Sequence, residues 1–441
     1  MASPMPLFRE ASEWPVLGEY EVAVFGAGPA GIGAACAAGR LGARTILVEQ
    51  LGFPGGVATA ACCPYLMGFG HGGRQIVGGV ADELVRELDA MGHARFMTTP
   101  CGTPEPRPIG SRALTTNVIV SVEGLRVAAN RLLERAGVCR LYYTSLVGAV
   151  AEGDRVLAAA VNRKEGLGLI RARAFVDATG DADLVWRAGG GVRDYAVEES
   201  MTKSLLMRVG GVPHFHRGAV EEVFARLVAE GKVPFEAQDR FMGFALLNPG
   251  EVLLNFTLIA GNGLSSEDLT RMDGDLREQA LVTVEWFRRE VPQFAHCFLV
   301  DVAAQVGVRA GRGIVGLETI TPQDLDDNTP VPEPVSLGQR SYGGHGLTGF
   351  APAWHKSNPG LRGIPWRTLL SASFTNVATG GRSVSCDPRA LDSLRLMSRC
   401  MATGQAAGVS AALAAQADGA IPPVGYASVR ESLLGQGAIL E

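Results

Sequence analysis

The chain has 441 residues, of which 47% are hydrophobic and 19% are charged, and its formal net charge is −5. This composition is typical of a well-buried globular enzyme and excludes a disordered or fibrous chain. The length exceeds one ordinary core and indicates two interleaved domains, while the acidic balance argues against nucleic acid as the main partner.

Neither a targeting segment nor a membrane span is predicted. The N-terminal stretch lacks a basic region followed by an apolar core, and no run has the roughly 18 apolar residues of a membrane helix, so we expect a soluble, cytoplasmic protein. The eight cysteines form no C-x-x-C pair and no ladder of metal ligands, which indicates buried or free thiols. His214 and His216 would share one face of a strand but have no third ligand nearby, so no metal site is predicted.

The first motif is "EVAVFGAGPAGIGAACAAGRLGARTILVEQ", residues 21–50. It reads as a buried strand over 21–25, an Ala-rich helix, and a second strand over 45–49. Gly26, Gly28 and Gly31 have the spacing G-x-G-x-x-G, in which the first glycine permits the tight turn, the second admits a pyrophosphate and the third allows helix–strand contact. Glu49 closes the second strand, where a carboxylate can accept from ribose hydroxyls. The motif predicts a dinucleotide site, for either an exchangeable nicotinamide or a retained flavin.

The next elements alternate between regular and glycine-rich segments. Residues 51–79 are too rich in glycine for a regular element, and a helix follows over 80–91. Residues 98–116 hold four prolines and predict a surface excursion that could serve as a lid. An amphipathic helix ending at Gly137 precedes a meander around a turn at 152–154 and a buried strand ending near Asp177.

The pattern of predicted elements changes between residues 195 and 355. A strand over 251–259, a long helix over 273–291 and a Pro-, Gly- and His-rich stretch over 326–349 indicate an inserted antiparallel platform. A last helix near 394–416 carries small residues in its middle, which suit packing against another helix or a cofactor ring. We therefore expect an α/β fold with a Rossmann-like domain in two parts, 18–194 and 356–430, and an inserted α+β substrate domain on an antiparallel sheet over 195–355.

Three separated segments resemble one family. "LVEQLGFPGGVATA", "VDATGDADL" and "GGRSVSCDPRALDSLRLMSRCMATGQAAG" are similar to FAD-dependent oxidoreductases of the glutathione-reductase-like superfamily, with succinate-dehydrogenase-type flavoproteins as more distant relatives. "GVRAGRGIVGLETITPQDL" is similar to a family stretch too. The resemblance implies a glutathione-reductase-like fold and a tightly held FAD, which settles the open choice towards flavin.

The resemblance also implies the residues that hold FAD. Glu49 would bind the adenosine ribose, Val147 would meet the adenine through its backbone, and Arg382 stands where many relatives have an acid. The full implied set is Gly26, Gly28, Pro29, Ala30, Gly31, Glu49, Gln50, Gly55, Gly56, Val57, Ala58, Thr59, Val147, Ala178, Thr179, Gly180, Asp181, Gly381, Arg382, Gly404, Gln405, Ala406 and Ala407. Arg382 and a turn from Gly404 to Gly408 would cover the ribityl chain and the pyrimidine end of the ring.

The expected activity is hydride transfer between a small organic substrate and FAD, by a dehydrogenase or oxidase with an external electron acceptor such as oxygen or a redox carrier. No second strand-G-x-G-x-x-G-helix motif and no C-x4-C pair is present, which argues against a pyridine-nucleotide-disulfide reductase. The alternatives are a flavin monooxygenase or halogenase using NAD(P)H and oxygen, and a flavin-bearing binding or RNA-modifying protein. The sequence is compatible with a homo-oligomer.

The candidate catalytic residues lie on glycine-rich loops. His71 follows the flavin-lining segment and is the best-placed proton acceptor, with His345 and His355 as further candidates and a structural histidine as the alternative for each. Arg309 could clamp a substrate carboxylate or pair with an acid of the inserted domain, and Arg312 is a second candidate. Cys62 and Cys63 are adjacent, so a mutual disulfide would be strained, and one of them could link covalently to flavin.

Overall fold

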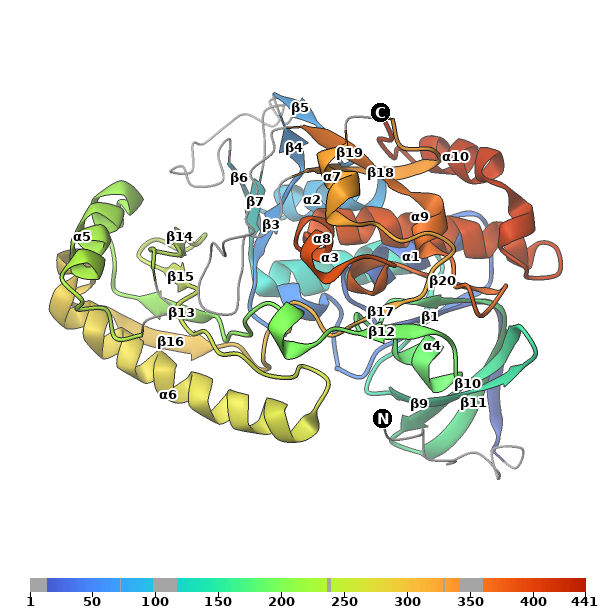
Figure 1. Ribbon diagram of the computed structural model, residues 1–441, viewed down its shortest axis with the longest axis horizontal. Coiled ribbons are helices and arrows are strands. Elements are labelled where there is room, and N and C mark those ends of the chain that lie inside the picture. Colours follow the sequence, from blue (N-terminus) through green and yellow to red (C-terminus); the bar gives the residue numbers. More distant parts are fainter. Residues whose placement is uncertain (1–13, 72, 98–116, 236–238, 328–329, 341–359) are drawn as a thin grey trace.

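The computed structural model describes residues 14–71, 73–97, 117–235, 239–327, 330–340 and 360–441 (Figure 1). Its largest sheet has seven strands in the order β8-β2-β1-β11-β10-β9, with β20 beside β11. β8, β2, β1, β11 and β20 are parallel, whereas β9, β10 and β11 form an antiparallel meander. The bounds are β1 (Val16–Phe25), β2 (Thr45–Val48), β8 (Cys139–Leu141), β9 (Ser145–Glu152), β10 (Arg155–Arg163), β11 (Gly166–Asp177) and β20 (Val377–Thr379).

Strand β11 joins the parallel and antiparallel parts of this sheet. Its first half pairs with β10, where Arg163 lies opposite Gly166, and its last residues pair with β20, where Phe175 lies opposite Val377. Strand β1 runs along its other side. Because β20 comes from the last part of the chain, residues far apart in sequence complete one sheet, as expected for a domain interrupted by an insertion.

Helices α1 (Pro29–Arg40) and α9 (Met397–Ala415) lie against one face of this sheet (Figure 1). Three further helices pack on these two: α2 (Gly79–Ala90), α3 (Val122–Arg135) and α10 (Tyr426–Gly435). Helices α1 and α9 pack closely: a Cβ on Gly404 would lie 2.0 Å from the Ala30 carbonyl oxygen, and one on Gly408 would lie 2.1 Å from that of Ala34. The small residues in the middle of α9 therefore serve helix–helix contact.

A second sheet, antiparallel and four-stranded, lies in the inserted part of the chain. It runs β14 (Gly243–Ala245), β15 (Val252–Leu254), β13 (Met207–Gly210), β16 (Phe298–Val302), and α5 (Arg217–Ala229) and α6 (Ser266–Glu290) accompany it. Its core is aromatic and contains Phe224, Phe241, Phe256, Trp286, Phe287 and Phe294. Helix α6 begins where Ser265 caps the Asp268 N–H, seven residues before the expected start, and β15 is shorter than the expected strand.

Shorter elements connect the two sheets. One is a three-stranded sheet in the order β3 (Tyr65–Met67), β7 (Asn117–Val120), β6 (Ala94–Met97). Three strand pairs follow: β4 (Gly70–His71) with β5 (Arg74–Gln75), β12 (Val192–Asp194) with β17 (Arg312–Ile314), and β18 (Pro334–Gln339) with β19 (Leu361–Pro365). The short helices are α4 (Asp183–Arg187), α7 (Pro322–Asp326) and α8 (Pro388–Leu394). Pairing of β12 with β17 brings both ends of the inserted sheet's segment together. The predicted fold class, a Rossmann-like fold with an inserted α+β part on an antiparallel sheet, is confirmed.

The structure differs from the sequence prediction at His214 and His216, and it does not describe the expected surface excursion. His214 and His216 do not share a strand face: His214 lies in a turn, and His216 caps α5 by accepting the Ala219 N–H at Nδ1, 3.2 Å away. The surface excursion expected over 98–116 lies outside the described residues. In the described ranges, no helix is both long and apolar enough to span a membrane.

Candidate cofactor and substrate site

The three glycines of the first turn have separate structural roles. Gly26 has φ +93°, and a Cβ there would lie 2.4 Å from the Ala178 carbonyl oxygen; one on Gly31 would lie 1.7 Å from that of Gly26. Gly28 differs, because the nearest atom to its ideal Cβ is the Gly56 Cα at 3.9 Å. Gly26 and Gly31 thus permit close backbone packing, whereas Gly28 leaves its open side to a cavity at the N-terminus of α1.

Two connected cavities begin at this turn. The larger, about 140 Å³, is lined by Gly26, Gly28, Pro29, Ala30, Glu49, Gln50, Leu51, Gly56, Val57, Ala178, Thr179, Gly180, Gln305, Gly380, Gly381, Arg382, Arg395, Met397 and Cys400. The smaller, about 90 Å³, is lined by Phe25, Gly26, Val48, Glu49, Gln50, Thr144, Leu146, Thr179 and Asp183. They share four wall residues and therefore adjoin each other, and we call the two together the dinucleotide cavity.

Glu49 stands where the two parts of the dinucleotide cavity meet. Its carboxylate accepts the Ala27 N–H at 2.7 Å and the Leu51 N–H at 2.9 Å. Burial raises the pKa of Glu49, and the backbone N–H groups of Leu51, Ala27 and Gln50 oppose that rise. A buried carboxylate at the end of β2 is suited to accept from ribose hydroxyls.

The second glycine turn lies directly against the first. The Gly55 N–H donates to the Ala27 carbonyl at 2.8 Å, and a Cβ on Gly56 would lie 2.9 Å from the Gly28 Cα. Gly56 and its neighbour Val57 line the dinucleotide cavity, whereas the Thr59 hydroxyl donates to the Pro54 carbonyl at 3.0 Å within its own turn. Gly55, Ala58 and Thr59 are absent from the wall and shape the turn instead.

The end of β11 supplies the opposite wall. Asp177 is fully buried and accepts the Thr179 hydroxyl at 2.7 Å and the Leu184 N–H at 2.9 Å, and burial raises its pKa. Asp181 pairs with Arg382, whose Nη1 lies 3.1 Å from Oδ1. The turn after β11 and the turn after β20 are thereby linked at the cavity.

The structure corrects the expected turn from Gly404 to Gly408. These residues lie in the middle of α9, where Ala406 and Ala407 are fully buried, and the helix begins at Met397. The Gln405 Oε1 accepts the Val80 N–H at 3.1 Å, so this amide holds the start of α2. The helix positions that line the dinucleotide cavity are Met397 and Cys400, because the N-terminal end of α9 approaches it.

Val147, whose backbone is expected to meet the adenine, stays a predicted contact. Its carbonyl accepts from Nη1 of Arg187 at 3.2 Å, and it does not line the smaller part of the cavity. The neighbouring Leu146 and Thr144 do.

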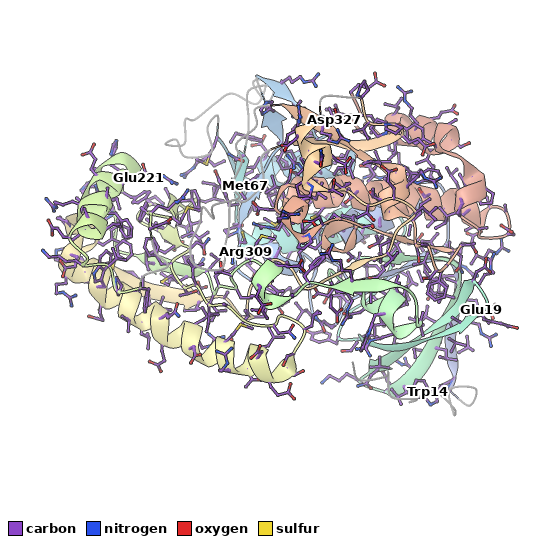
Figure 2. The ribbon with its side chains drawn as sticks, in the orientation of Figure 1. Trp14, Glu19, Met67, Glu221, Arg309 and Asp327 are labelled. Carbon is purple, nitrogen blue, oxygen red and sulfur yellow. The ribbon has the colours of Figure 1, made fainter. Side chains whose placement is uncertain are left out.

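A third cavity adjoins the first two and is largely apolar. We call it the apolar cavity; its volume is about 150 Å³, and it shares Val57, Arg382, Arg395 and Met397 with the dinucleotide cavity. Its other wall residues are Ala61, Cys63, Tyr65, Met67, Ser204, Leu206, Met242, Phe244, Leu253, Asn255, Gly307, Val308, Arg309 and Leu396. Figure 2 shows Arg309 and Met67 at the centre of the molecule, between the β13–β16 sheet and the part that contains α9.

Arg309 brings a positive charge to the apolar cavity. It donates to the Thr202 carbonyl at 2.6 Å and to the Ser204 hydroxyl at 2.9 Å, both neutral acceptors. Burial and the charge of Arg395 lower the pKa of Arg309 to about 9. Among the described residues no carboxylate lies within ion-pair distance of Arg309, unlike Arg395, which pairs with Asp392.

The structure does not place the other candidate catalytic residues at the apolar cavity. His71 lies on the β4–β5 hairpin and is absent from the walls of all three cavities, while His345 and His355 lie outside the described residues. Arg312 pairs with Asp194 at 2.7 Å, so it holds the β12–β17 pair together. The structure therefore leaves Arg309 as the one described candidate at the cavity wall.

The adjacent cysteines have different positions. Cys62 is buried, whereas Cys63 lines the apolar cavity, and both thiols are free. Burial raises the pKa of Cys63, so its thiol stays neutral and adds no negative charge beside Arg309. In the part of the chain that the structure describes, no group of three or more His, Cys, Asp or Glu side chains is arranged to hold a metal ion.

Several wall residues were missed by the sequence analysis. Gln305 and Asp183 line the dinucleotide cavity, and Tyr65, Phe244 and Asn255 line the apolar cavity. The position of Asp183 just after "VDATG" could have indicated it. Tyr65 and Phe244 come from different sheets, and no sequence spacing brings them together.

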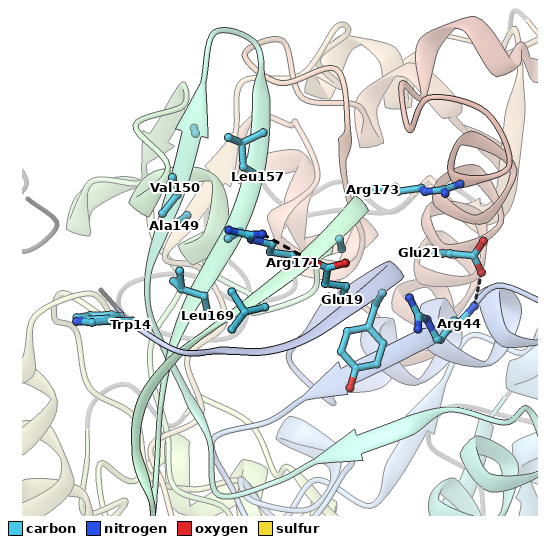
Figure 3. Close-up of a pocket in the computed structure, with 15 residues that line it drawn as sticks. Trp14, Glu19, Glu21, Arg44, Ala149, Val150, Leu157, Leu169, Arg171 and Arg173 are labelled. Carbon is cyan, nitrogen blue, oxygen red and sulfur yellow. Dashed lines mark hydrogen bonds and ion pairs between the residues drawn. The ribbon is translucent and has the colours of Figure 1, made fainter. Parts of the chain in front are cut away.

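A further hollow lies on the outer face of the meander, remote from the glycine turns (Figure 3). Its walls include Trp14, Leu157, Leu169, Glu19 and Arg171, and the last two form an ion pair at 3.5 Å. It contains no glycine turn and shares no wall residue with the other cavities.

The dinucleotide cavity fits the family to which the chain belongs. Residues 21–433 match the family of FAD-dependent oxidoreductases, so the protein is a member of it. Its cofactor is FAD, and the open side of Gly28, the N-terminus of α1 and the buried Glu49 suit the pyrophosphate and ribose of such a molecule.

The chain is also similar, at lower identity, to individual known proteins. The chain is 28% identical over 154 residues to the tRNA uridine 5-carboxymethylaminomethyl modification enzyme MnmG of Dichelobacter nodosus, a match that covers 33% of this chain and 22% of that enzyme. Among solved structures, it is similar to a geranylgeranyl bacteriochlorophyll reductase-like protein from Thermoplasma acidophilum, with 11% identity, a TM-score of 0.49 and coverage of 95% and 84% of the two chains. It is also similar to the anhydrotetracycline hydroxylase OxyS from Streptomyces rimosus, with 12% identity, a TM-score of 0.47 and coverage of 94% and 66%.

Proposed function

We propose that the protein is an FAD-dependent dehydrogenase or oxidase that acts on a small organic substrate held in the apolar cavity. The reaction would oxidise a C–H bond next to oxygen or nitrogen, or form a C=C bond by running a C=C reduction in reverse, so that in either case the substrate gives two electrons to FAD. The observation that carries this proposal is the wall shared by the two cavities: Val57, Arg382, Arg395 and Met397 line both. A substrate in one would lie beside a cofactor in the other.

We assign cofactor binding to the residues that the structure gathers around the dinucleotide cavity. The N–H groups at the start of α1 would bind the pyrophosphate beside Gly28, and Glu49 would accept from the ribose. Thr179, Gly180 and Arg382 would hold the part of the cofactor that leads to the apolar cavity. When bound, FAD supplies the hydride acceptor for the reaction.

We assign substrate selection to the inserted part of the chain, residues 195–355, with residues 18–194 and 356–430 holding the cofactor. Much of the apolar wall comes from the insertion: Ser204, Leu206, Met242, Phe244, Leu253, Asn255, Gly307, Val308 and Arg309. These side chains exclude water from the reacting bond, and Arg309 orients a polar group of the substrate. The electrons then leave to an external acceptor, either oxygen or a redox carrier.

Anaerobic titration of the FAD-loaded protein with pooled small metabolites tests this function. Bleaching of the flavin absorption without added NAD(P)H, followed by return of the colour with oxygen or a carrier dye, is the expected result. Bleaching only by NAD(P)H, with oxygen consumed when an organic substrate is added, would instead support a monooxygenase or halogenase. An RNA-modifying role would require RNA binding at low salt, which a filter assay measures.

A further inference from the structure

We infer that the substrate is a monocarboxylate with an apolar body, whose carboxylate binds Arg309. This inference rests on the proposed function, because it names the class of molecule that the apolar cavity takes. It depends on three features of the cavity wall: an unpaired cation, the pairing of the other cations, and the apolar surface around them.

The first feature is the charge of Arg309. Its acceptors among the described residues are the Thr202 carbonyl, the Ser204 hydroxyl and, at 3.5 Å, the Asn255 amide oxygen, so neutral oxygens orient the guanidinium without neutralising its charge. A partly buried cation without a counter-ion is unfavourable, and a carboxylate that binds it relieves this cost through charge-assisted hydrogen bonds. Arg309 lines the cavity, so such an anion can reach it.

The second feature limits the substrate to one negative charge. The other two guanidinium groups of the wall already have partners among the described residues, since Arg382 pairs with Asp181 and Arg395 with Asp392. In the part of the chain that the structure describes, Arg309 is therefore the one guanidinium of this wall without a carboxylate partner. A second carboxylate on the substrate would enter an apolar wall without a free cation to meet it, which is unfavourable.

The third feature is the nature of the rest of the wall. Tyr65 of β3 and Phe244 of β14 stack with ring centroids 4.4 Å apart. Leu206, Met242 and Leu253 add aliphatic and thioether surface from the inserted sheet. A chain or ring of carbon atoms buries apolar area against this surface, so it contributes affinity that a small hydrophilic acid lacks.

Isothermal titration calorimetry on the FAD-loaded protein tests the inference with four probes: phenylacetate, phenylacetamide, hexanoate and glutarate. We expect the two apolar monocarboxylates to bind at least about tenfold more tightly than the neutral amide or the dicarboxylate, because charge-assisted hydrogen bonds are lost in the amide. Equal binding of phenylacetate and phenylacetamide, tighter binding of glutarate, or no binding of any probe would overturn the inference.

Variants of Arg309 test whether this residue causes the preference for the acid over the amide. Arg309→Gln should remove the preference for acid over amide, Arg309→Lys should retain part of it, and Arg208→Gln, which removes a charge on β13 outside the cavity, should leave it unchanged. An unchanged preference in folded Arg309→Gln would place the anion elsewhere and overturn the assignment. The probe series on the unaltered protein decides the substrate class even where a variant does not fold.

The flavin content of the same samples separates this inference from the proposed function. A yellow protein that binds none of the acids contradicts the substrate class alone. A protein that cannot retain flavin but prefers the acids contradicts the proposed function alone, because calorimetry does not depend on the flavin signal.

Discussion

Arg382 and Asp181 form an ion pair, with Nη1 3.1 Å from Oδ1, that joins the turn after β20 to the turn after β11. Both residues also line a further space of about 530 Å³, whose wall includes Thr179, Gln305 and, from the inserted part of the chain, Thr270. Since the two turns belong to the first and last parts of the chain, the pair holds the two parts of the cofactor domain together at the place where FAD is expected to bind.

This pair predicts effects of opposite sign on FAD affinity. Arg382→Gln leaves the Asp181 carboxylate unpaired beside the cavity for an anionic cofactor, so FAD should bind about tenfold more weakly, the loss of roughly one charge-assisted contact. Asp181→Asn frees the guanidinium for the cofactor and should leave FAD affinity unchanged or higher. Fluorescence titration of the apoprotein with FAD measures both, and equal losses in the two variants would contradict this account.

Gly28→Val should remove FAD binding while the fold remains. Its φ of −70° suits any residue and its Cβ meets nothing closer than 3.9 Å, so the added side chain costs the apoprotein little. The side chain enters the dinucleotide cavity, and FAD affinity should fall on the order of 10- to 100-fold. The flavin-to-protein ratio and the thermal midpoint Tm of the apoprotein measure the two effects.

Two other glycines provide controls for that variant. Gly274→Val, in the open middle of α6, should alter neither flavin content nor the fold. Gly31→Ala should destabilise the protein, because its Cβ would lie 1.7 Å from the Gly26 carbonyl oxygen. Normal flavin content in Gly28→Val would show that the motif serves only as a turn.

The sequence predicted the local parts of this site well because they depend on neighbours in the chain. The turn at Gly26 and Gly28, the strand ending at Glu49 and the meander before Asp177 follow from glycine spacing and alternation of apolar residues. The small residues of α9 were interpreted less well. Their spacing allows contact with a helix or with a cofactor, and only the position of Ala30 and Ala34 on α1 decides between the two.

The apolar cavity could not be predicted in the same way. Its walls combine β3, β14, the loop containing Arg309 and the start of α9, segments whose order in the sequence gives no sign that they meet. His71 is the opposite case: the sequence places it shortly after a flavin-lining segment, whereas in the structure it lines none of the three cavities. It lies on the β4–β5 hairpin, opposite Arg74.

The ionisation of Glu49 predicts a pH dependence of stability in the apoprotein. Burial raises the pKa of Glu49 in the folded state, so the neutral acid favours folding. That contribution is present below the unfolded-state pKa and is lost as the pH rises through the folded-state pKa. Glu49→Gln removes this dependence, so its Tm should rise relative to that of the unaltered apoprotein between pH 4 and pH 8. A Tm difference that is constant across this range would contradict the assignment.

His71→Ala should leave the chemistry nearly unchanged. Since His71 lines none of the three cavities, we expect flavin content and the rate of anaerobic flavin reduction to stay within about twofold of the unaltered protein. Loss of a positioned general base would instead slow reduction roughly 100- to 10,000-fold. Stopped-flow absorbance with the identified substrate distinguishes these outcomes, and a slow variant with full FAD content would restore the histidine as a candidate base.

The most direct test of the central claim, that this fold holds FAD without a covalent link, is acid precipitation of the purified protein followed by chromatography of the supernatant. We predict a yellow supernatant that contains FAD in a ratio near one per chain, or a colourless protein that takes up FAD to that ratio when it is supplied. Recovery of FMN or a nicotinamide dinucleotide alone, or a protein that cannot be reconstituted with FAD, would contradict the account of the cofactor site. Colour that stays with the precipitate would contradict the non-covalent link and direct attention to Cys63 at the cavity wall.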